Sequence, residues 1–242
     1  MSLWHLTKDS DKPTKTHQYS LYGMHVCPYT HRVKLILNAK KIPYDMVNID
    51  LHNKPAWFKD INPEGRVPAL DTGNEILIES LQIANFLDRT HPNPPLYSQN
   101  PEVARQEKDL ILRVELLIHL WNRCVFQMEE LNVNQWITKF VPHLIALEKE
   151  LIKRGTKYFG GAKPGMIDYV LWPWAERSEC VNMSLKTTMP INVFNFPKLW
   201  HWKLDMLDDE AVKEAFVGPE KYWKIAEAKL TGAIPDYDNT LI

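Results

Sequence analysis

The sequence predicts a small α/β domain followed by an all-helical domain, and three observations support this prediction. Early in the chain, short apolar stretches with strand-like alternation lie on either side of an amphipathic segment. A proline-rich stretch then interrupts every regular pattern, and beyond it apolar residues recur at helical spacing. We divide the chain into an N-terminal extension, residues 1–18, an α/β domain, residues 19–90, a linker, residues 91–102, and a helical domain, residues 103–242.

The α/β domain begins with a predicted strand, helix and strand. Gln18–Val26 is rich in Tyr, Leu and Val, which is typical of a strand. Pro28 suits the first turn of a helix, and the amphipathic pattern that follows it stops before Pro43. Tyr44–Ile49 alternates as a second strand. We expect the two strands to be parallel, with the helix as their crossover.

The rest of this domain predicts a hairpin and a helix. Val67–Leu70 and Glu75–Ile78 are short strand-like runs, and Asp71–Asn74 between them contains the turn residues of a hairpin. Ser80 is a favourable N-cap residue for a helix over Leu81–Arg89.

Proline content predicts the linker, and the periodicity of apolar residues predicts the helical domain. Four prolines within residues 91–101 exclude a helix interior or a central strand. One predicted helix then presents a stripe of Leu110, Val114, Leu117, Trp121, Val125 and Met128, and a second presents Ile137, Phe140, Leu144, Leu147 and Leu151. Three further helices are expected. The first starts near Gly165–Asp168, the second covers Pro197–Leu207 and the third covers Pro219–Leu230.

Composition excludes several classes of protein. Lys and Arg total 29 against 30 Asp and Glu, and this net charge of −1 argues against nucleic-acid or anionic-membrane binding. No apolar run approaches the ~18 residues of a membrane span. The first fifteen residues are too polar for a signal peptide, so we expect a cytoplasmic protein. Three scattered cysteines predict no disulfide framework, and the histidines lack metal-ligand spacing.

Cys27 is the strongest candidate for chemistry. It follows the first predicted strand and precedes Pro28, so its sulfur would lie at a helix N-terminus, where the unpaired N–H groups stabilise a thiolate. His31 and Arg32 are expected to add positive charge nearby. The alternative is a small buried apolar side chain, the commoner fate of a single cysteine. The strand-end position and the polar neighbours favour a reactive thiol.

Thr30 stands where a second cysteine would complete a Cys-x-x-Cys pair. Cys27 therefore lacks a resolving thiol in its own motif and needs an external thiol to complete a redox cycle. Cys124 and Cys180 have apolar neighbours, which favours simple packing roles for both.

Two further motifs are weaker when taken alone. Pro68 opens a strand directly after a loop; a cis bond there would turn the Val67 backbone outward to pair with a peptide-like ligand, and an ordinary trans proline is equally compatible. Ser80 at a helix N-terminus can bind a carboxylate while Glu79 binds an ammonium group. A simple helix cap is the alternative for Glu79 and Ser80.

A thiolate, an edge for a peptide backbone and a site for an amino-acid zwitterion together describe glutathione as the ligand. The whole chain resembles an omega-class glutathione transferase, with a thioredoxin-like N-terminal domain and an all-α C-terminal domain. The matching stretches are Cys27–Tyr29, Asn53–Phe58, Asn62–Pro68, Glu79–Ser80 and Met166–Arg177.

The resemblance implies roles for particular residues. Cys27 would form a mixed disulfide with glutathione. The glutathione-binding residues would be Tyr29, Lys54, Val67, Pro68, Glu79 and Ser80, and the second-substrate pocket would include Arg177 and Trp223. Asp168 matches a structural acid of the family, and we assign it to folding.

The function implied is that of a glutathione-dependent thiol transferase with dehydroascorbate reductase activity. Glutathione would be the co-substrate, with no metal, and the second substrate a small electrophilic, disulfide or oxidised compound. We expect a homodimer. The alternatives are glutathione conjugation with Tyr22 or Ser20 activating the thiol, a reductase or synthase acting on pteridine-like pigment precursors, and a non-catalytic ligand-binding protein of the same fold.

Overall fold

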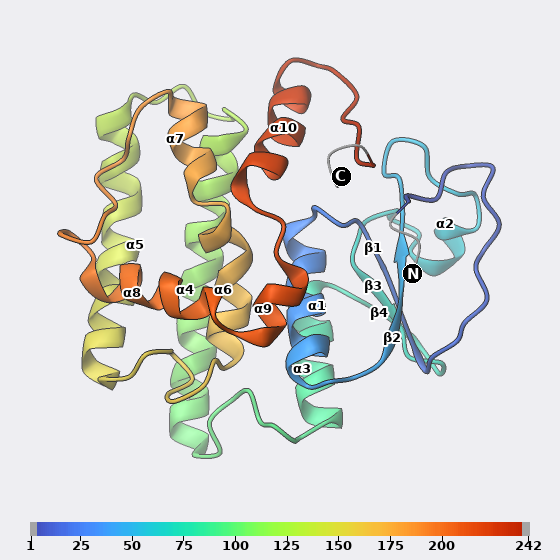
Figure 1. Ribbon diagram of the computed structural model, residues 1–242, viewed down its shortest axis with the longest axis horizontal. Helices are drawn as coiled ribbons and strands as arrows, with labels where there is room; N and C mark the ends of the chain where they lie inside the picture. The colour runs from blue at the N-terminus through green and yellow to red at the C-terminus, as the bar shows by residue number, and fades with distance from the viewer. Residues whose placement is uncertain (1–3, 239–242) are drawn as a thin grey trace.

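A computed structural model describes residues 4–238 of the chain. A four-stranded sheet with its helices forms one half of the molecule, and long helices form the other half (Figure 1). This arrangement confirms the predicted order of an α/β part followed by a helical part.

The sheet has the strand order β2-β1-β3-β4. Its strands are β1 (Tyr19–Gly23), β2 (Tyr44–Asn48), β3 (Ala69–Asp71) and β4 (Ile76–Ile78). β1 and β2 are parallel and joined by α1 (Pro28–Ala39), as the pattern predicted. β3 is antiparallel to both β1 and β4, which confirms the hairpin.

Helices cover both faces of this sheet. α1 packs against α3 (Ser80–Thr90) on the face toward the helical half (Figure 1). The short α2 (Phe58–Ile61), which the pattern did not predict, lies on the opposite face, where Phe58 packs with Tyr22 and Val47. α1 and α3 therefore lie between the sheet and the helical half.

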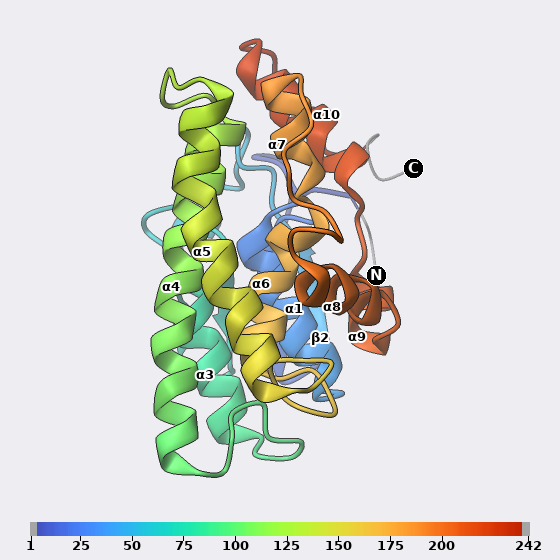
Figure 2. The same ribbon diagram turned by 90° about the vertical axis from the view of Figure 1, so that its left-hand side faces the viewer.

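The helical half is built on two long neighbouring helices, α4 (Pro101–Val125) and α5 (Val133–Arg154), which run side by side in Figure 2. Asn100 caps α4 by accepting from Glu102 N and Val103 N. The remaining helices are α6 (Met166–Glu176), α7 (Glu179–Leu185), α8 (Pro197–Leu207), α9 (Glu210–Ala215) and α10 (Pro219–Leu230). The predicted helices are confirmed, whereas the short α7 and α9 were not predicted.

Met128 was wrongly assigned to the apolar stripe of the first long helix. That helix ends at Val125, and Gln127 adopts a positive φ of 49°, which turns the chain away from the helix axis. Met128 then lies outside the helix with 69% of its surface exposed. The assignment failed because the apolar residues of the sequence keep their helical spacing for about one turn after the helix has ended.

α6 is the central helix of the interface between the two halves, since it packs against α1, α4 and α8. Its start is held by Asp168, whose carboxylate accepts hydrogen bonds from Phe159 N, Gly160 N and Gly165 N at 2.8–2.9 Å. The Trp202 indole donates to the same carboxylate at 2.7 Å. Burial raises the pKa of Asp168 to about 6, although these hydrogen bonds act in the opposite direction.

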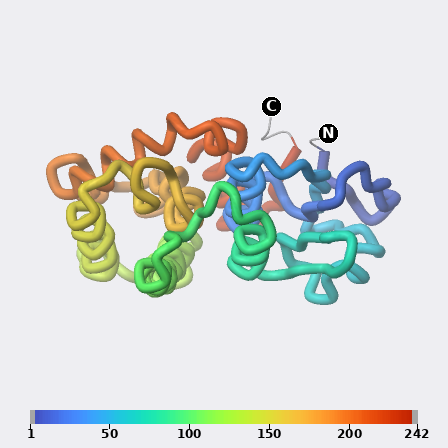
Figure 3. The backbone as a smooth tube through the Cα atoms, turned by 90° about the horizontal axis from the view of Figure 1, so that it is seen from below, coloured from blue at the N-terminus to red at the C-terminus, as the bar shows by residue number. Residues whose placement is uncertain are grey.

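The segments near both chain ends meet beside the sheet (Figure 3). Leu6 forms a parallel bridge with Ile49, next to the end of β2. His5 Nδ1 lies 2.6 Å from the Asp238 carboxylate, and the His5 ring packs 5.5 Å from that of Tyr237. Within residues 4–238, no helix is long and apolar enough to cross a membrane.

Candidate active site

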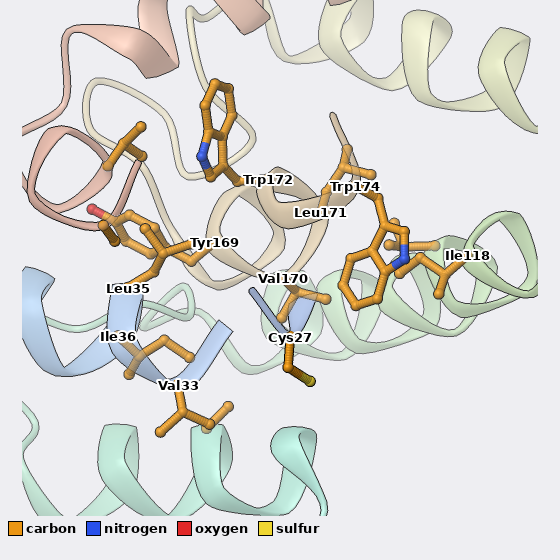
Figure 4. Packing of buried hydrophobic residues seen from close by; sticks show 14 of the residues in the cluster. Cys27, Val33, Leu35, Ile36, Ile118, Tyr169, Val170, Leu171, Trp172 and Trp174 are labelled. Carbon is orange, nitrogen blue, oxygen red and sulfur yellow. The ribbon is translucent and has the colours of Figure 1, made fainter. Parts of the chain in front are cut away.

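Cys27 occupies the N-cap position of α1, directly before Pro28 in the first turn. Its backbone is extended, with φ −68° and ψ 121°, and its carbonyl accepts from His31 N at 2.9 Å. The side chain is 9% exposed, at the border of the group of side chains that contains Val170 and Trp174 (Figure 4). The first N–H groups of a helix have no partner within it, so the N-terminus of α1 beside Cys27 is suited to binding an anion.

Arg32 ties four elements together beneath this position. Its Nε donates to Val170 O on α6 at 3.0 Å, and its Nη1 donates to Ser80 Oγ on α3 at 3.3 Å. Its Nη2 forms an ion pair with Glu115 on α4. The predicted cation near Cys27 is therefore present, and it is also a buried structural link between the two halves.

Tyr29 and Trp174 form an aromatic contact over Arg32. The two rings meet edge-to-face with centroids 5.0 Å apart, and the guanidinium carbon of Arg32 lies 4.3 Å from the Trp174 ring centroid. The Tyr29 hydroxyl accepts from Asn122 Nδ2 at 3.5 Å, so it faces α4. Burial raises the pKa of Tyr29, which keeps the phenol protonated at neutral pH.

The expectation that His31 adds positive charge is wrong. Its side chain is fully buried, and Nδ1 faces Arg177 Nη1 at 3.0 Å. Burial, followed by the charge of Arg177, lowers the pKa of His31 well below its usual value. His31 is therefore a neutral imidazole that accepts a hydrogen bond from Arg177.

The loop before β3 carries the predicted peptide-binding edge. The Val67–Pro68 bond is cis, and Val67 precedes the first paired residue of β3, so its backbone is outside the sheet ladder. The buried Asn62, which we did not predict, shapes this loop by donating through Nδ2 to Arg66 O at 2.9 Å and accepting from Glu64 N at 3.1 Å.

Lys54 lies over the same loop. A Cβ placed on Gly65 would be only 3.1 Å from Lys54 Nζ, which locates the ammonium group beside this glycine. Gly65 also has φ +63°, a conformation that glycine adopts without cost. The Lys54 ammonium group therefore lies beside the same loop that contains Val67, the predicted peptide-binding edge.

Glu79 and Ser80 begin α3, but Ser80 is not the N-cap. Glu79 takes that position with φ 67° and ψ 113°, and Ser80 is the first helical residue. Ser80 therefore does not cap α3, and its hydroxyl instead accepts a hydrogen bond from Arg32 Nη1. A positive φ in a residue with a side chain is uncommon and often marks a functional site. The Glu79 carboxylate is 58% exposed and lies 3.6 Å from Arg66 Nη2.

Arg177, which the resemblance assigns to the second-substrate pocket, lies in the interior of the structure. Its side chain is fully buried, donates to Pro173 O at 2.7 Å, and stacks over the Tyr222 ring at 4.9 Å. Arg177 follows α6 and faces inward because α1 and α10 cover it. Trp223 is half-buried on α10 and packs against the main core.

Two titratable side chains of the C-terminal region are influenced by the charge of Cys27, and sequence reasoning missed them. Burial lowers the pKa of Lys229 on α10, while the Cys27 charge acts in the opposite direction. Burial, Asp50 and then Cys27 raise the pKa of Tyr237 to about 12. These residues are more than two hundred positions from Cys27 in the sequence, so no local pattern could associate them.

The other cysteines and Tyr22 have different surroundings. Burial raises the pKa of Cys124 and of Cys180 to about 12, which supports the packing roles predicted for both. Tyr22 packs with Trp57 and Phe58 on the opposite face of the sheet, where burial raises its pKa to about 12. Among residues 4–238, no group of three or more potential metal ligands occurs.

Comparison with known families gives two matches that together cover most of the chain. Residues 21–95 match the glutathione S-transferase N-terminal domain, and residues 115–202 match the glutathione S-transferase C-terminal domain. The two matches lie on the sheet-bearing half and on the helical half.

Curated relatives are similar over about two thirds to nearly all of the chain. A pyrimidodiazepine synthase from Drosophila melanogaster is 34% identical, with 97% of this chain and 96% of that protein covered. Glutathione S-transferase omega-1 from Sus scrofa is 32% identical, with 82% and 80% covered. Human glutathione S-transferase omega-2 is 35% identical, with 65% of each covered.

Solved structures share the fold. Glutathione transferase Omega 2C from Trametes versicolor matches with a TM-score of 0.73 and 20% identity, over 89% of this chain and 99% of that chain. A Tau class glutathione S-transferase from mango matches with a TM-score of 0.78 and 21% identity, over 88% and 99%.

Proposed function

Because the chain belongs to the omega class of the glutathione transferases, we propose that it is a glutathione-dependent thiol transferase whose nucleophile is Cys27. The observation that supports this proposal most strongly is that Cys27 is the N-cap residue of α1. Thr30, three residues later, stands where a second cysteine would complete a Cys-x-x-Cys pair. The sulfur is at the edge of the core, whereas Cys124 and Cys180 are 1% and 0% exposed.

The reaction takes two thiol–disulfide exchanges. The Cys27 thiolate attacks the glutathionyl sulfur of a mixed disulfide, the S–S bond breaks, and the substrate leaves as a thiolate that takes a proton from water. Cys27 is then disulfide-bonded to glutathione. A second glutathione thiolate attacks the glutathionyl sulfur of this intermediate, releases glutathione disulfide and restores the Cys27 thiolate. Thr30 cannot resolve the intermediate, so glutathione must.

We propose that three groups of residues bind the three parts of glutathione. The Val67 backbone, outside the ladder, would pair with the cysteinyl amide group, and Pro68 would fix that edge. The N–H of Ser80 at the start of α3 would bind the γ-glutamyl carboxylate, and Glu79 its ammonium group. Lys54 would lie near the glycyl carboxylate, and the Tyr29 ring would form one wall.

Dehydroascorbate reduction needs the same thiolate. Cys27 would add to a carbonyl carbon of dehydroascorbate, and glutathione would attack the sulfur of that adduct, releasing ascorbate and leaving the Cys27–glutathione disulfide. A second glutathione completes the cycle. The two glutathione molecules supply two electrons and end as one glutathione disulfide, so the reaction balances.

Glutathione conjugation is the weaker enzyme assignment. It requires a hydroxyl that hydrogen-bonds to the bound glutathione thiol. Tyr22 packs on the sheet face opposite α1, away from the start of that helix, so its hydroxyl is unsuited to this role. Ser20, on the same strand, is only 1% exposed, so its hydroxyl is also poorly placed to reach a bound thiol.

A second candidate function rests on the relative with the longest coverage among those reported above. The pyrimidodiazepine synthase is 34% identical over 97% of this chain. A glutathione-dependent synthase acting on a pteridine-like pigment precursor would use the same thiolate and the same glutathione site. Assaying purified protein on such a precursor, beside a glutathionylated peptide and dehydroascorbate, ranks the substrates directly.

We also propose that the protein is a cytoplasmic homodimer with glutathione as its co-substrate. The balanced charge and the family assignment support this proposal. Sedimentation of the purified protein measures the assembly state.

Cys27→Ala tests the proposed mechanism. Removing the covalent route should lower thiol transfer by several orders of magnitude, beyond the ~10²–10⁴-fold of a lost acid–base group. Glutathione affinity should persist because Val67, Glu79 and Ser80 are unchanged. Cys124→Ala is the matched control and should retain activity. Retained thiol transfer in Cys27→Ala would refute the mechanism, and loss of aryl halide conjugation alone would favour the conjugating enzyme. No activity in the unmodified protein would favour a ligand-binding role.

A further inference from the structure

Arg66 links the loop before β3 to the start of α3. It directly precedes Val67, and its carbonyl oxygen accepts from Asn62 Nδ2 at 2.9 Å. Its side chain forms an ion pair with Glu64, and its Nη2 atom lies 3.6 Å from Glu79 Oε1. The guanidinium is therefore held beside the carboxylate that we propose to bind the γ-glutamyl ammonium group of glutathione.

The Arg66 side chain keeps hydrogen-bond donors for a ligand. Both of its ion pairs use Nη2, and among residues 4–238 neither Nε nor Nη1 of Arg66 has a hydrogen-bond acceptor. The side chain is 65% exposed, which leaves it open to a ligand. A guanidinium binds a carboxylate through two parallel N–H groups. Arg66 can therefore bind a ligand carboxylate while it remains paired with Glu64.

Arg66 and Glu79 together match the charges of an amino acid. An α-amino acid carries its ammonium group and its carboxylate on the same carbon atom, so a site for it needs two opposite charges side by side. The 3.6 Å between Arg66 Nη2 and Glu79 Oε1 meets this need. Each of these two side chains would then face a ligand group of opposite sign.

The charges along the loop also match the whole of glutathione. Lys54 is a second exposed cation here, and its ammonium group lies beside Gly65. Glutathione carries two carboxylates and one ammonium group. Lys54, Arg66 and Glu79 provide two positive charges and one negative charge, which is the opposite set. Lys54 is assigned to the glycyl carboxylate under the proposed function, so the γ-glutamyl carboxylate remains for Arg66.

From these observations, we infer that Arg66 binds the γ-glutamyl carboxylate of glutathione, beside the N–H groups at the start of α3, and so selects ligands with an intact amino-acid group. This inference rests on the proposed glutathione-dependent function. Because Arg66 is exposed, its contribution is modest and is weakened by salt.

Calorimetric titration with two ligands at low salt tests this inference on the full-length protein. One ligand is glutathione, and the other is 4-aminobutanoyl-cysteinylglycine, which lacks only the γ-glutamyl carboxylate. Arg66→Gln should weaken glutathione binding roughly threefold to fivefold, the upper range for an exposed ion pair, and should not weaken binding of the second ligand. Arg66→Lys keeps the charge without the two parallel N–H groups, so it should restore only part of the loss.

Arg89→Gln is the matched control, because it removes the same charge from an exposed position in the last turn of α3. It should leave both affinities unchanged. The Asn62 bond to the Arg66 carbonyl is available to every variant, so the loop keeps this support.

The outcomes separate this inference from the proposed function. If Arg66→Gln weakens both ligands equally, or leaves glutathione binding unchanged, the inference is wrong. A gain in glutathione affinity would also overturn it, since Arg66 would then only compete with the ligand for Glu79. A wild-type protein that binds neither ligand would contradict the proposed function itself, and the inference with it.

Discussion

The guanidinium Nη1 of Arg32 donates to the Ser80 hydroxyl at 3.3 Å. This bond joins α1, which Cys27 precedes as the N-cap, to α3, whose N-terminus is the predicted γ-glutamyl site. Both ends of the proposed glutathione site therefore rest on one buried cation. The same cation reaches Val170 O and Glu115 in the helical half. Arg32 therefore links α1 and α3 to α4 and α6 of the helical half.

Replacing Arg32 should reduce stability strongly. Arg32→Met keeps much of the buried volume but removes the partner of Glu115 and of Val170 O, and we expect a loss of about 3–5 kcal/mol in the free energy of unfolding. Urea unfolding followed by circular dichroism measures this loss. Arg105→Met, on the exposed face of α4, is the matched control and should change little. Equal stability of the two variants would contradict the structural role of Arg32.

Glutathione affinity should depend more on Glu79 than on Lys54. Glu79 is at the start of α3 with a fixed backbone conformation, so under the proposal it would pair with the ammonium group while the helix N-terminus would hold the carboxylate. Lys54 provides one flexible ion pair, which is typically worth ~0–1 kcal/mol. Calorimetric titration of Glu79→Ala and Lys54→Ala with glutathione compares them. A larger or equal loss in Lys54→Ala would reverse this ranking.

Asp168 should make stability depend on pH in a specific window. Burial raises its pKa from 3.8 to about 6, so between these values the folded chain holds a proton that the unfolded chain releases. The contribution of Asp168 to the free energy of unfolding therefore falls as pH rises from about 4 to about 6, and it is constant above that range.

Asp168→Asn removes this titration. The difference in unfolding free energy between wild type and variant should change by up to about 1.4 kcal/mol per pH unit across the window, with wild type losing stability relative to the variant as pH rises. Urea unfolding of both proteins at several pH values measures it. Parallel stability curves would show that Asp168 has no raised pKa in the folded state.

Local sequence signals predicted the elements that hold the candidate site. Pro28 marked the start of α1, and the turn residues between β3 and β4 marked the hairpin, because proline and turn chemistry act within a few residues. Ser80 was misassigned because a serine before an apolar run usually caps a helix. Here Glu79 takes the cap with a positive φ, which no residue pattern announces.

The missed features depend on contacts distant in the sequence. Arg32 was expected to act only on the thiolate, but its bond to Val170 O spans 138 positions. His31 was expected to carry charge, and its neutrality follows from burial under Arg177, 146 positions away. The short α7 and α9 contain too few turns for a clear periodic signal.

The most direct test of the central claim is the intact mass of the protein after brief treatment with glutathione disulfide, followed by mapping of the modified residue. The account predicts one added glutathionyl group, located on Cys27 and released by excess glutathione, with Cys124 and Cys180 unmodified. No adduct, or an adduct on Cys124 or Cys180 in place of Cys27, would contradict it.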